Sequence, residues 1–364
     1  MSPSVAMAVV LSAARAVVQN PARRRSSALQ RANQGRPSAY TSLVCAALSA
    51  AVMACSQGAV GTSSQQPPRA ASSQLRGPAD IAMPPLADAD VTTPGGVRVF
   101  SWNVSDDAFV KDPAAFRALV RKARADILLL DEVAPTTNEQ QIRAALAGVT
   151  TGGTDRWHVD FGTSGGRQRG VIVSRLPLEP LPEFADVVAY PAGERGRLSD
   201  RMSAVGALDP LFSMAGGIPV NGVVVLAGER RLLVVTTDLQ CCGGEPGSWQ
   251  EERRRVEAAE LRRRIGQVLE RTRVDGLIVA GDFNLVGTVL PLAILSGPYR
   301  SPHAGLIAAE LCHLDGQETW TWDGRGTPFP SRAMDFVLYG PHALALVTAT
   351  SWTQPTLRSR NWTP

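Results

Sequence analysis

The stretch LIVAGDFN, residues 277–284, decides the fold class predicted for this chain. Its four apolar residues predict a short buried strand that ends at Gly281. Asp282 and Asn284 follow at once, so a carboxylate and a carboxamide lie at a sheet edge, where ligands usually bind in α/β proteins. Because Gly-Asp-x-Asn also suits an ordinary turn, a functional site here needs support from other parts of the chain.

Strand and helix patterns alternate on both sides of this stretch. The alternation or apolar runs of strands occur at residues 97–104, 127–130, 157–161, 170–174, 222–226, 231–237 and 335–339. Helices are predicted at residues 112–125, 140–146, 249–273 and 288–296. Residues 177–219 give no clear pattern, and residues 350–364 show no strand pattern. The alternation predicts an α/β or α+β layered domain over residues 97–364.

The helix predicted over residues 249–273 is charged throughout and has a narrow apolar stripe. Two groups of three arginines, at 253–255 and 262–264, lie among glutamates at helical i±3 and i±4 spacing. This pattern predicts a solvent-exposed face of ion pairs. A nucleic-acid interface is the less favoured interpretation.

The first 54 residues predict an export signal. Residues 41–54, TSLVCAALSAAVMA, form an apolar run that is too short for a normal membrane span. The run ends before Cys55, which resembles the lipidated cysteine of a bacterial lipoprotein. We therefore expect a membrane-anchored lipoprotein, in the periplasm or at the cell surface, with ordinary secretion as the second choice. Residues 55–96 are rich in Ser, Pro and Gln and predict a flexible tether.

Charge and cysteines restrict the function classes. Residues 1–54 carry six arginines and no acid, so the rest of the chain has 31 basic and 33 acidic residues. A net charge of −2 there gives no argument for nucleic-acid binding. In an exported protein, Cys241 or Cys242 could form a disulfide with Cys312, and three free thiols are the alternative. No Cys-x-x-Cys spacing indicates a zinc site.

Four predicted strands end at, or contain, polar side chains that carry oxygen ligands. These side chains are Asn103, Glu132, Asp282 with Asn284, and Asp335. A Mg²⁺ site typically uses one or two carboxylates, several waters and a substrate phosphate. Such an ion neutralises phosphate charge during an in-line displacement. The set therefore predicts a phosphate-directed Mg²⁺ site, with Mn²⁺ as the alternative cofactor.

Six short motifs follow one another along these strands. They are Trp-Asn-Val, Asp-Glu-Val, Arg-Gly-Val-Ile-Val-Ser, Thr-Thr-Asp-Leu, Gly-Asp-Phe-Asn and Met-Asp-Phe-Val-Leu. Their order resembles the endonuclease/exonuclease/phosphatase superfamily, which includes deoxyribonuclease-I-like nucleases, neutral sphingomyelinases and inositol-phosphate phosphatases. The resemblance implies a four-layer sandwich of two stacked mixed β-sheets flanked by helices. It also implies a metal-dependent hydrolase of phosphodiesters or phosphomonoesters.

The same resemblance implies a role for each polar side chain. Glu132 would bind Mg²⁺ with help from Asn103. Asp282 would orient or deprotonate the attacking water, and Asn284 would donate hydrogen bonds to the phosphoryl oxygens. Asp335 would orient a final histidine or assist the metal. The substrate would be a nucleic acid, a lipid headgroup or a small phosphodiester, and the near-neutral charge disfavours a processive nuclease.

Two departures from the family pattern leave the activity of this chain open. Asp238 stands where nuclease-like members have histidine, and it would be a metal or water ligand, or a turn and cap residue. The terminal Ser-Asp-His is absent, and His342, the only histidine after Asp335, is interpreted as a loop residue. Arg169 either contacts the substrate phosphate or lies in a surface turn. The alternative function is a catalytically degenerate surface lipoprotein on the same scaffold, which lacks the terminal Ser-Asp-His. The same absence predicts a domain that is truncated or altered at its C-terminus and lacks a sheet strand as well as the histidine.

Overall fold

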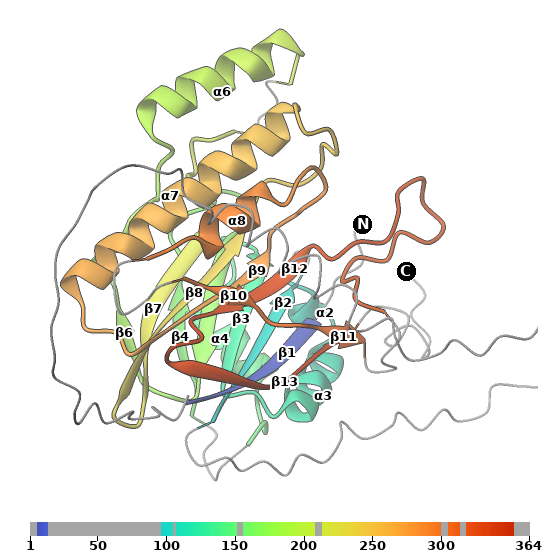
Figure 1. The fold of residues 1–364 in the computed structure, drawn as a ribbon. Coiled ribbons are helices and arrows are strands. Elements are labelled where there is room, and N and C mark those ends of the chain that lie inside the picture. The colour runs from blue at the N-terminus through green and yellow to red at the C-terminus, as the bar shows by residue number, and fades with distance from the viewer. Residues whose placement is uncertain are drawn as a thin grey trace, which may run out of the picture.

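The computed structural model describes residues 6–13, 96–104, 107–150, 156–207, 213–299, 305–313 and 318–352. Two mixed β-sheets stack face to face, and helices cover their outer faces (Figure 1). The predicted class, a four-layer α/β sandwich, is therefore confirmed. Within the described residues, no helix is long and apolar enough to cross a lipid bilayer.

The first sheet has seven strands in the order β11-β13-β1-β2-β3-β5-β4. Pairs β2–β3 and β11–β13 are parallel, and the other neighbours are antiparallel. In sheet order the strands are β11 (Cys312–His313), β13 (Leu344–Trp352), β1 (Ala6–Ala13), β2 (Val97–Asn103), β3 (Ile127–Val133), β5 (Arg169–Ser174) and β4 (His158–Phe161).

The second sheet has six strands in the order β10-β12-β9-β8-β7-β6, with only β8 and β9 parallel. In sheet order the strands are β10 (Ile307–Ala308), β12 (Asp335–Tyr339), β9 (Gly276–Asp282), β8 (Arg230–Asp238), β7 (Val220–Ala227) and β6 (Leu178–Pro180).

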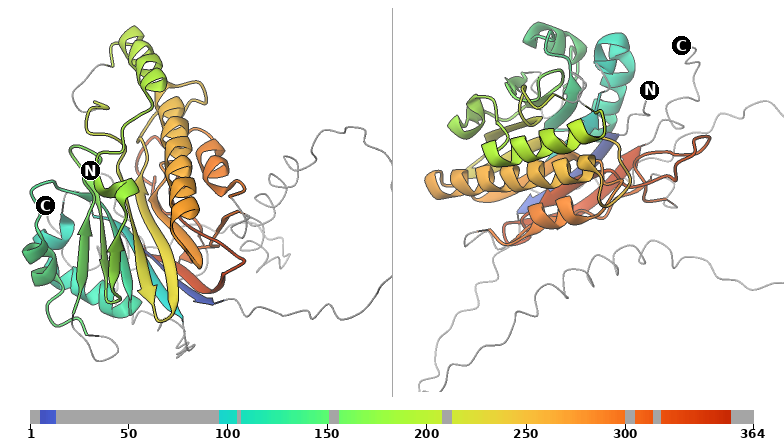
Figure 2. Two further views of the ribbon diagram at one scale, coloured as in Figure 1. Left: turned by 90° about the vertical axis from the view of Figure 1, so that its left-hand side faces the viewer. Right: turned by 90° about the horizontal axis from the view of Figure 1, so that it is seen from above.

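Helices form the two outer layers, and their ends follow local capping chemistry. Asp112 accepts a hydrogen bond from the backbone N–H of Ala115 at the start of α3, and Ser248 caps α7 in the same way. Helices α6 and α7 lie side by side outside the six-stranded sheet (Figure 2). The helices are α2 (Ala108–Lys111), α3 (Pro113–Ala123), α4 (Glu139–Ala145), α5 (Pro182–Ala185), α6 (Ala192–Ala204), α7 (Trp249–Arg271) and α8 (Leu290–Ser296).

Strand β9 explains why its sequence is a continuous apolar run. Leu277 and Val279 pack into the core beneath α7 and α8, whereas Ile278 and Ala280 pack into the core between the two sheets. Successive side chains of a strand point to opposite faces, and both faces of β9 are covered. The strand is therefore buried on both sides, as parallel-paired strands in α/β proteins usually are.

Strand β1 comes from a segment that the sequence assigns to the export signal. It pairs antiparallel with β2, from Ala6 opposite Trp102 to Leu11 opposite Val97, and with β13 on its other side. The folded sheet therefore includes residues far upstream of Val97, where the sequence predicts that the domain begins. Cys55 and the predicted tether lie outside the described residues.

The prediction that the C-terminal region lacks a sheet strand is wrong. Strand β13 extends to Trp352 and pairs with β1 and β11. Residues 350–352 have no strand pattern of their own, but neighbours on both sides satisfy their backbone groups, and tertiary pairing outweighs weak local propensity. Residues 353–364 lie outside the described part of the chain.

Candidate active site

Three aspartates stand in one row where neighbouring strands of the six-stranded sheet meet. Asp335 at the start of β12 pairs in register with Asp282 at the end of β9. Asp238, at the end of β8, lies opposite Asp282 on the other side. The strand order β12-β9-β8 therefore brings together carboxylates that are far apart in sequence.

The seven-stranded sheet supplies the facing side of this site. Asn103 ends β2 and lies in register with Asp131 of β3, the residue before Glu132. The side-chain amide of Asn103 donates to Glu132 Oε1 at 3.0 Å and faces Asp282 Oδ2 at 3.4 Å. Asn103 therefore links the two sheets at the point where their polar ends converge.

Unusual backbone conformations aim the polar side chains. Glu132 and Asn284 have positive φ values of 55° and 49°, a region that non-glycine residues rarely adopt. The pairing of β3 with β5 shifts register between Leu130 and Val133, so Glu132 lies in an irregularity. Strain of this kind concentrates at functional sites, where surrounding structure holds it.

Gly281 is required at the end of β9 for a steric reason. Its φ is 139°, and a Cβ atom at this position would lie 1.9 Å from the carbonyl oxygen of Thr237. Any side chain would push β8 and β9 apart just before the aspartate row. The glycine of Gly-Asp-Phe-Asn therefore allows the close approach that brings Asp238 and Asp282 together.

Asn284 holds two strand ends in place. Its side-chain amide donates to Asp238 Oδ1 at 3.1 Å and to the carbonyl oxygen of Leu239 at 2.8 Å. Its backbone N–H donates to Asp282 Oδ1 at 2.8 Å. The predicted phosphoryl ligand therefore also positions Asp282 and Asp238, and its Nδ2 is occupied by protein acceptors in this structure.

Two buried residues next to the site, Thr321 and Asp131, were not predicted from the sequence. Thr321 Oγ1 donates to Asp335 Oδ2 at 2.6 Å and accepts from the backbone N–H of Asp335 and of Met334, each at 2.9 Å. Asp131 is fully buried, and its Oδ1 accepts from Thr236 Oγ1 at 2.5 Å. Asp131 Oδ2 is buried without a hydrogen-bond partner among the described residues. The signal for Asp131 was an acid next to Glu132 within an otherwise apolar strand.

Burial dominates the electrostatics of the site. It raises the pKa of Asp282 to about 7, and the charge of Glu132 adds to this, against hydrogen bonds from Asn284 and Asn103. The pKa values of Asp131, Asp238 and Asp335 also lie well above the usual range, first because of burial and then because of neighbouring carboxylates. Each acid is therefore costly to ionise in this environment.

The donor set fits a hard divalent cation. Carboxylate and amide oxygens are the ligands that Mg²⁺ prefers, and Mg²⁺ keeps several waters, so it needs only one or two protein carboxylates. Within the described residues, no group of three or more His, Cys, Asp or Glu side chains is arranged to hold a metal ion.

Two further predicted residues lie elsewhere. Arg169 is in strand β5, so the surface-turn alternative is wrong. Its guanidinium donates to the carbonyl oxygen of Thr137 and lies 4.4 Å from the centre of the Phe161 ring. A substrate contact from Arg169 remains a prediction. His342 lies exposed in the turn after β12, at the opposite end of that strand from Asp335, as the loop interpretation predicts.

The cysteines do not form the predicted disulfide. Cys241 and Cys242 are free thiols, so neither is joined to Cys312. Cys312 lies in β11 of the seven-stranded sheet, whereas Cys241 and Cys242 follow β8 of the six-stranded sheet. The predicted disulfide between one of the adjacent cysteines and Cys312 is therefore wrong.

The arginines of α7 pair with glutamates as predicted, but the predicted exposure is wrong for part of the run. Arg254 is fully buried and lies 2.9 Å from Glu251, and Arg253 is buried against Glu257 at the same distance. The loop after β8 covers this end of the helix and accepts hydrogen bonds from Arg254. Tertiary packing has buried charged residues whose spacing indicates a solvated face.

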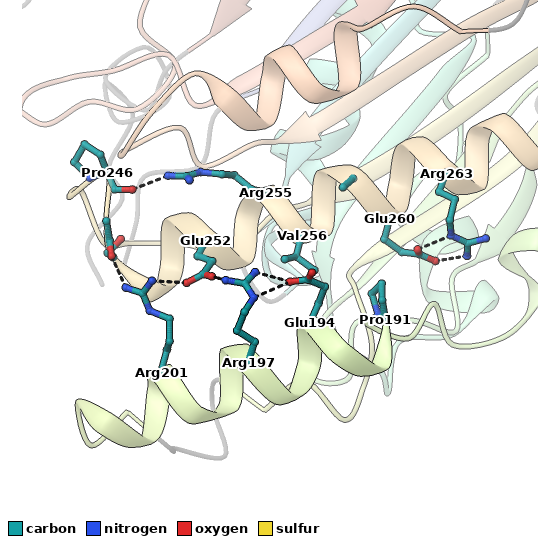
Figure 3. Close-up of a pocket in the computed structure, with 13 residues that line it drawn as sticks. Pro191, Glu194, Arg197, Arg201, Pro246, Glu252, Arg255, Val256, Glu260 and Arg263 are labelled. Atoms are coloured by element: carbon teal, nitrogen blue, oxygen red, sulfur yellow. Dashed lines mark hydrogen bonds and ion pairs between the residues drawn. The ribbon is translucent and has the colours of Figure 1, made fainter.

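A groove of about 470 Å³ between α6 and α7 is not part of this site. Arg197 and Arg201 of α6 both point toward Glu252 of α7, and Arg263 pairs with Glu260 (Figure 3). None of the side chains of the acidic site lines the groove. Because these arginines form ion pairs with glutamates, we interpret the groove as part of the packing contact between α6 and α7.

Comparisons with known proteins agree with this geometry. The sequence profile of the Endonuclease/Exonuclease/phosphatase family matches residues 100–357, and the chain belongs to this family. Its members act on phosphoester bonds. Comparison with curated protein sequences gave no match.

Solved structures that are similar to this chain have low sequence identity to it. Truncated TDP2 from Caenorhabditis elegans is 14% identical, with 64% of this chain and 78% of that chain covered and a TM-score of 0.41. The human nocturnin catalytic domain with bound sulfate is 16% identical, with 69% and 86% covered and a TM-score of 0.41. An endonuclease/exonuclease/phosphatase from Bacteroides vulgatus is 14% identical, with 64% and 79% covered and a TM-score of 0.37.

Proposed function

We propose that this chain is a divalent-metal-dependent phosphoesterase that hydrolyses a phosphodiester, or a phosphomonoester, by attack of water. One observation carries the proposal: the row Asp335, Asp282 and Asp238 faces Glu132 and Asn103 across the two sheets. Buried carboxylates that raise one another's pKa create a strong local demand for a cation. Family membership supplies the reaction class.

Each residue has a defined part in this proposal. Glu132 and the amide oxygen of Asn103 would hold Mg²⁺ or Mn²⁺, which supplies charge neutralisation of the phosphate. Asp282 takes the proton of the attacking water, and its pKa of about 7 suits a general base near neutral pH. Asn284 fixes the orientation of Asp282 through its backbone N–H. Asp335 is held in place by a hydrogen bond from Thr321 and adds a carboxylate on the side of Asp282 opposite Asp238.

Asp238 takes over the place of the family histidine. Burial and neighbouring acids raise its pKa, so the neutral acid persists and can donate a hydrogen bond to a phosphoryl oxygen. One of its oxygens is already an acceptor from Asn284, which leaves the other carboxyl oxygen to carry the proton. This arrangement supports a site that works without the terminal Ser-Asp-His.

A second candidate function is a catalytically degenerate scaffold. The absence of the terminal Ser-Asp-His and the replacement at Asp238 favour it. The two candidates differ in a simple measurement, because only an enzyme turns over an activated phosphodiester in a metal-dependent way.

The test is hydrolysis of bis(p-nitrophenyl) phosphate by the full chain, with Mg²⁺, with Mn²⁺ and with chelator. We expect chelator-sensitive turnover that falls by about 10²–10⁴-fold in Asp282→Ala. Asp186→Ala, which removes an exposed aspartate outside the site, is the matched control and should retain full turnover. A folded protein that shows no turnover with this substrate, a phosphomonoester and a small nucleic acid would favour the degenerate scaffold.

Membrane attachment through Cys55 is a separate part of the proposal, and sequence pattern alone supports it. Cleavage before Cys55 would separate residues 6–13 from the domain, and these residues form strand β1 between β2 and β13. The test grows cells that produce the wild type or Cys55→Ser with a radioactive fatty acid and measures the label attached to the protein. Label that depends on Cys55 supports it, and unlabelled protein that retains its first residues contradicts it.

A further inference from the structure

Two adjacent cysteines, Cys241 and Cys242, follow strand β8, and the proposed chemistry does not use them. Both are exposed free thiols. Their sulfur atoms lie 2.9 Å apart and share a hydrogen bond. Adjacent side chains in an extended segment point to opposite sides, so a shared hydrogen bond requires a special backbone at this point.

A buried arginine holds that backbone. Cys242 has a φ of 67°, in the left-handed region that non-glycine residues rarely adopt. The guanidinium of Arg254 donates to the carbonyl oxygens of Gln240 at 2.8 Å, of Cys242 at 2.6 Å and of Gly243 at 2.9 Å. Arg254 is itself fully buried and paired with Glu251. The loop thus keeps a strained conformation that faces one sulfur toward the other.

The two thiols differ in acidity. The hydrogen bond between the two thiols lowers the pKa of Cys242 to about 6, and the charge of Arg254 also favours the Cys242 thiolate. The same hydrogen bond raises the pKa of Cys241. Because the thiolate is the nucleophile in sulfur exchange, one sulfur is ready to attack while the other retains its proton.

We propose that Cys241 and Cys242 form a redox-active vicinal dithiol, which exchanges with a low-molecular-weight disulfide and closes to a disulfide within the loop. The Cys242 thiolate attacks one sulfur of the small disulfide, whose S–S bond breaks and releases one thiolate. Cys241 then loses its proton to solvent and attacks the Cys242 sulfur, and the second small thiolate leaves. The protein loses two electrons and two protons, and the small disulfide becomes two thiols.

The closed form should be readily reversible. Cα atoms of adjacent residues lie about 3.8 Å apart, which is below the usual range of about 4.4–6.8 Å for disulfides. A disulfide closed outside this range is strained and more easily reduced. Strained and exposed disulfides are the labile, regulatory ones. The pair therefore fits a reversible modification better than a structural bond.

The loop is also connected to the acidic site. Asn284 donates to the carbonyl oxygen of Leu239 and to Asp238, which lie two and three residues before Cys241. Closing the ring would move the Cys241–Cys242 peptide and disturb these hydrogen bonds. This consequence rests on the proposed phosphoesterase function, and we expect turnover to fall about 5-fold or more on oxidation.

The test incubates the full reduced chain with oxidised glutathione and maps its tryptic peptides by mass spectrometry. One peptide, residues 232–253, contains both cysteines. We expect it to lose the mass of two hydrogens and to carry no glutathione. In Cys241→Ser, the same peptide should retain a glutathione adduct on Cys242, and Cys312→Ser should behave as the wild type. A wild-type peptide that keeps both thiols reduced, or that ends with stable glutathione adducts, would overturn the proposal that the two cysteines close to a disulfide.

Turnover of the same samples separates the two parts of the inference. We expect lower turnover after oxidation and recovery with dithiothreitol, and no such change in the double variant Cys241→Ser/Cys242→Ser. Disulfide closure with unchanged turnover would overturn the connection to the acidic site and leave the dithiol supported. Absence of turnover in both redox states would count against the proposed function, while the peptide masses still decide whether the dithiol exists.

Discussion

Helix α7 and the acidic site both bury carboxylates, but they treat the charge in opposite ways. On α7, Glu251 and Glu257 are fully buried, and each has an arginine within 2.9 Å. At the site, no ion pair within the described residues joins Asp131, Asp238, Asp282 or Asp335 to a basic side chain. Burying an ion without a partner costs several kcal/mol. The contrast between ion-paired acids on the helix and acids without an ion pair at the sheet edge supports the proposal that the second group is functional.

The largest effect should come from breaking the paired region. Arg254→Met leaves Glu251 buried without its closest cation, and we expect a loss of about 3–5 kcal/mol in the free energy of unfolding. Arg263→Met is the matched control, because Arg263 pairs with Glu260 at the same i,i+3 spacing but is half exposed. Its loss should be about 0–1 kcal/mol. Urea unfolding measures both, and equal losses would contradict the contrast.

Replacing a buried carboxylate by its amide should change the free energy of unfolding in opposite directions in the two regions. Asp282→Asn removes an uncompensated charge, and we expect the metal-free protein at pH 8 to gain about 1–3 kcal/mol in the free energy of unfolding. Glu251→Gln removes the partner of Arg254 and should lose about 3 kcal/mol. Urea unfolding of both variants beside the wild type gives the comparison. A loss of stability in both would show that Asp282 is as well compensated as Glu251.

The pH dependence of stability should give a smaller but diagnostic effect. The pKa of Asp282 is about 7 in the folded state and near its ordinary value of 3.8 in the unfolded chain. Between these values only the folded state binds the proton, so the free energy of unfolding falls as pH rises. We expect the contribution of Asp282 to the stability of the metal-free wild type to fall by about 2 kcal/mol between pH 5 and pH 7. Asp282→Asn should show a flatter profile, and an equally steep one would contradict this assignment.

Much of the fold and the site could be predicted from strand ends. Asn103, Glu132, Asp282 and Asn284 lie at or just after the C-terminal ends of apolar strands. Asp335 begins an apolar strand that is antiparallel to β9, so strand pairing brings these residues together. The sequence therefore carried both the layer architecture and the chemical character of the site.

Contacts that depend on the tertiary structure could not be predicted from the sequence. Strand β1 is an apolar segment whose pattern equally fits an export signal, and only its pairing with β2 and β13 makes it a strand. Thr321 reaches Asp335 from a loop with no sequence signal. The spacing of Arg254 is that of an exposed helix residue. The loop that buries it follows strand β8, and the sequence of α7 contains no sign of that contact.

The most direct test of the central claim is whether a divalent cation stabilises the protein through the acids of the candidate site. The measurement is the free energy of unfolding of the full chain at pH 8, with Mg²⁺ and with chelator. We predict a gain of about 2.7 kcal/mol for the wild type at a Mg²⁺ concentration of about 100 times its Kd, and a much smaller gain for Glu132→Gln/Asp282→Asn. An absent gain in the wild type, or an equal gain in the double variant, would contradict the account.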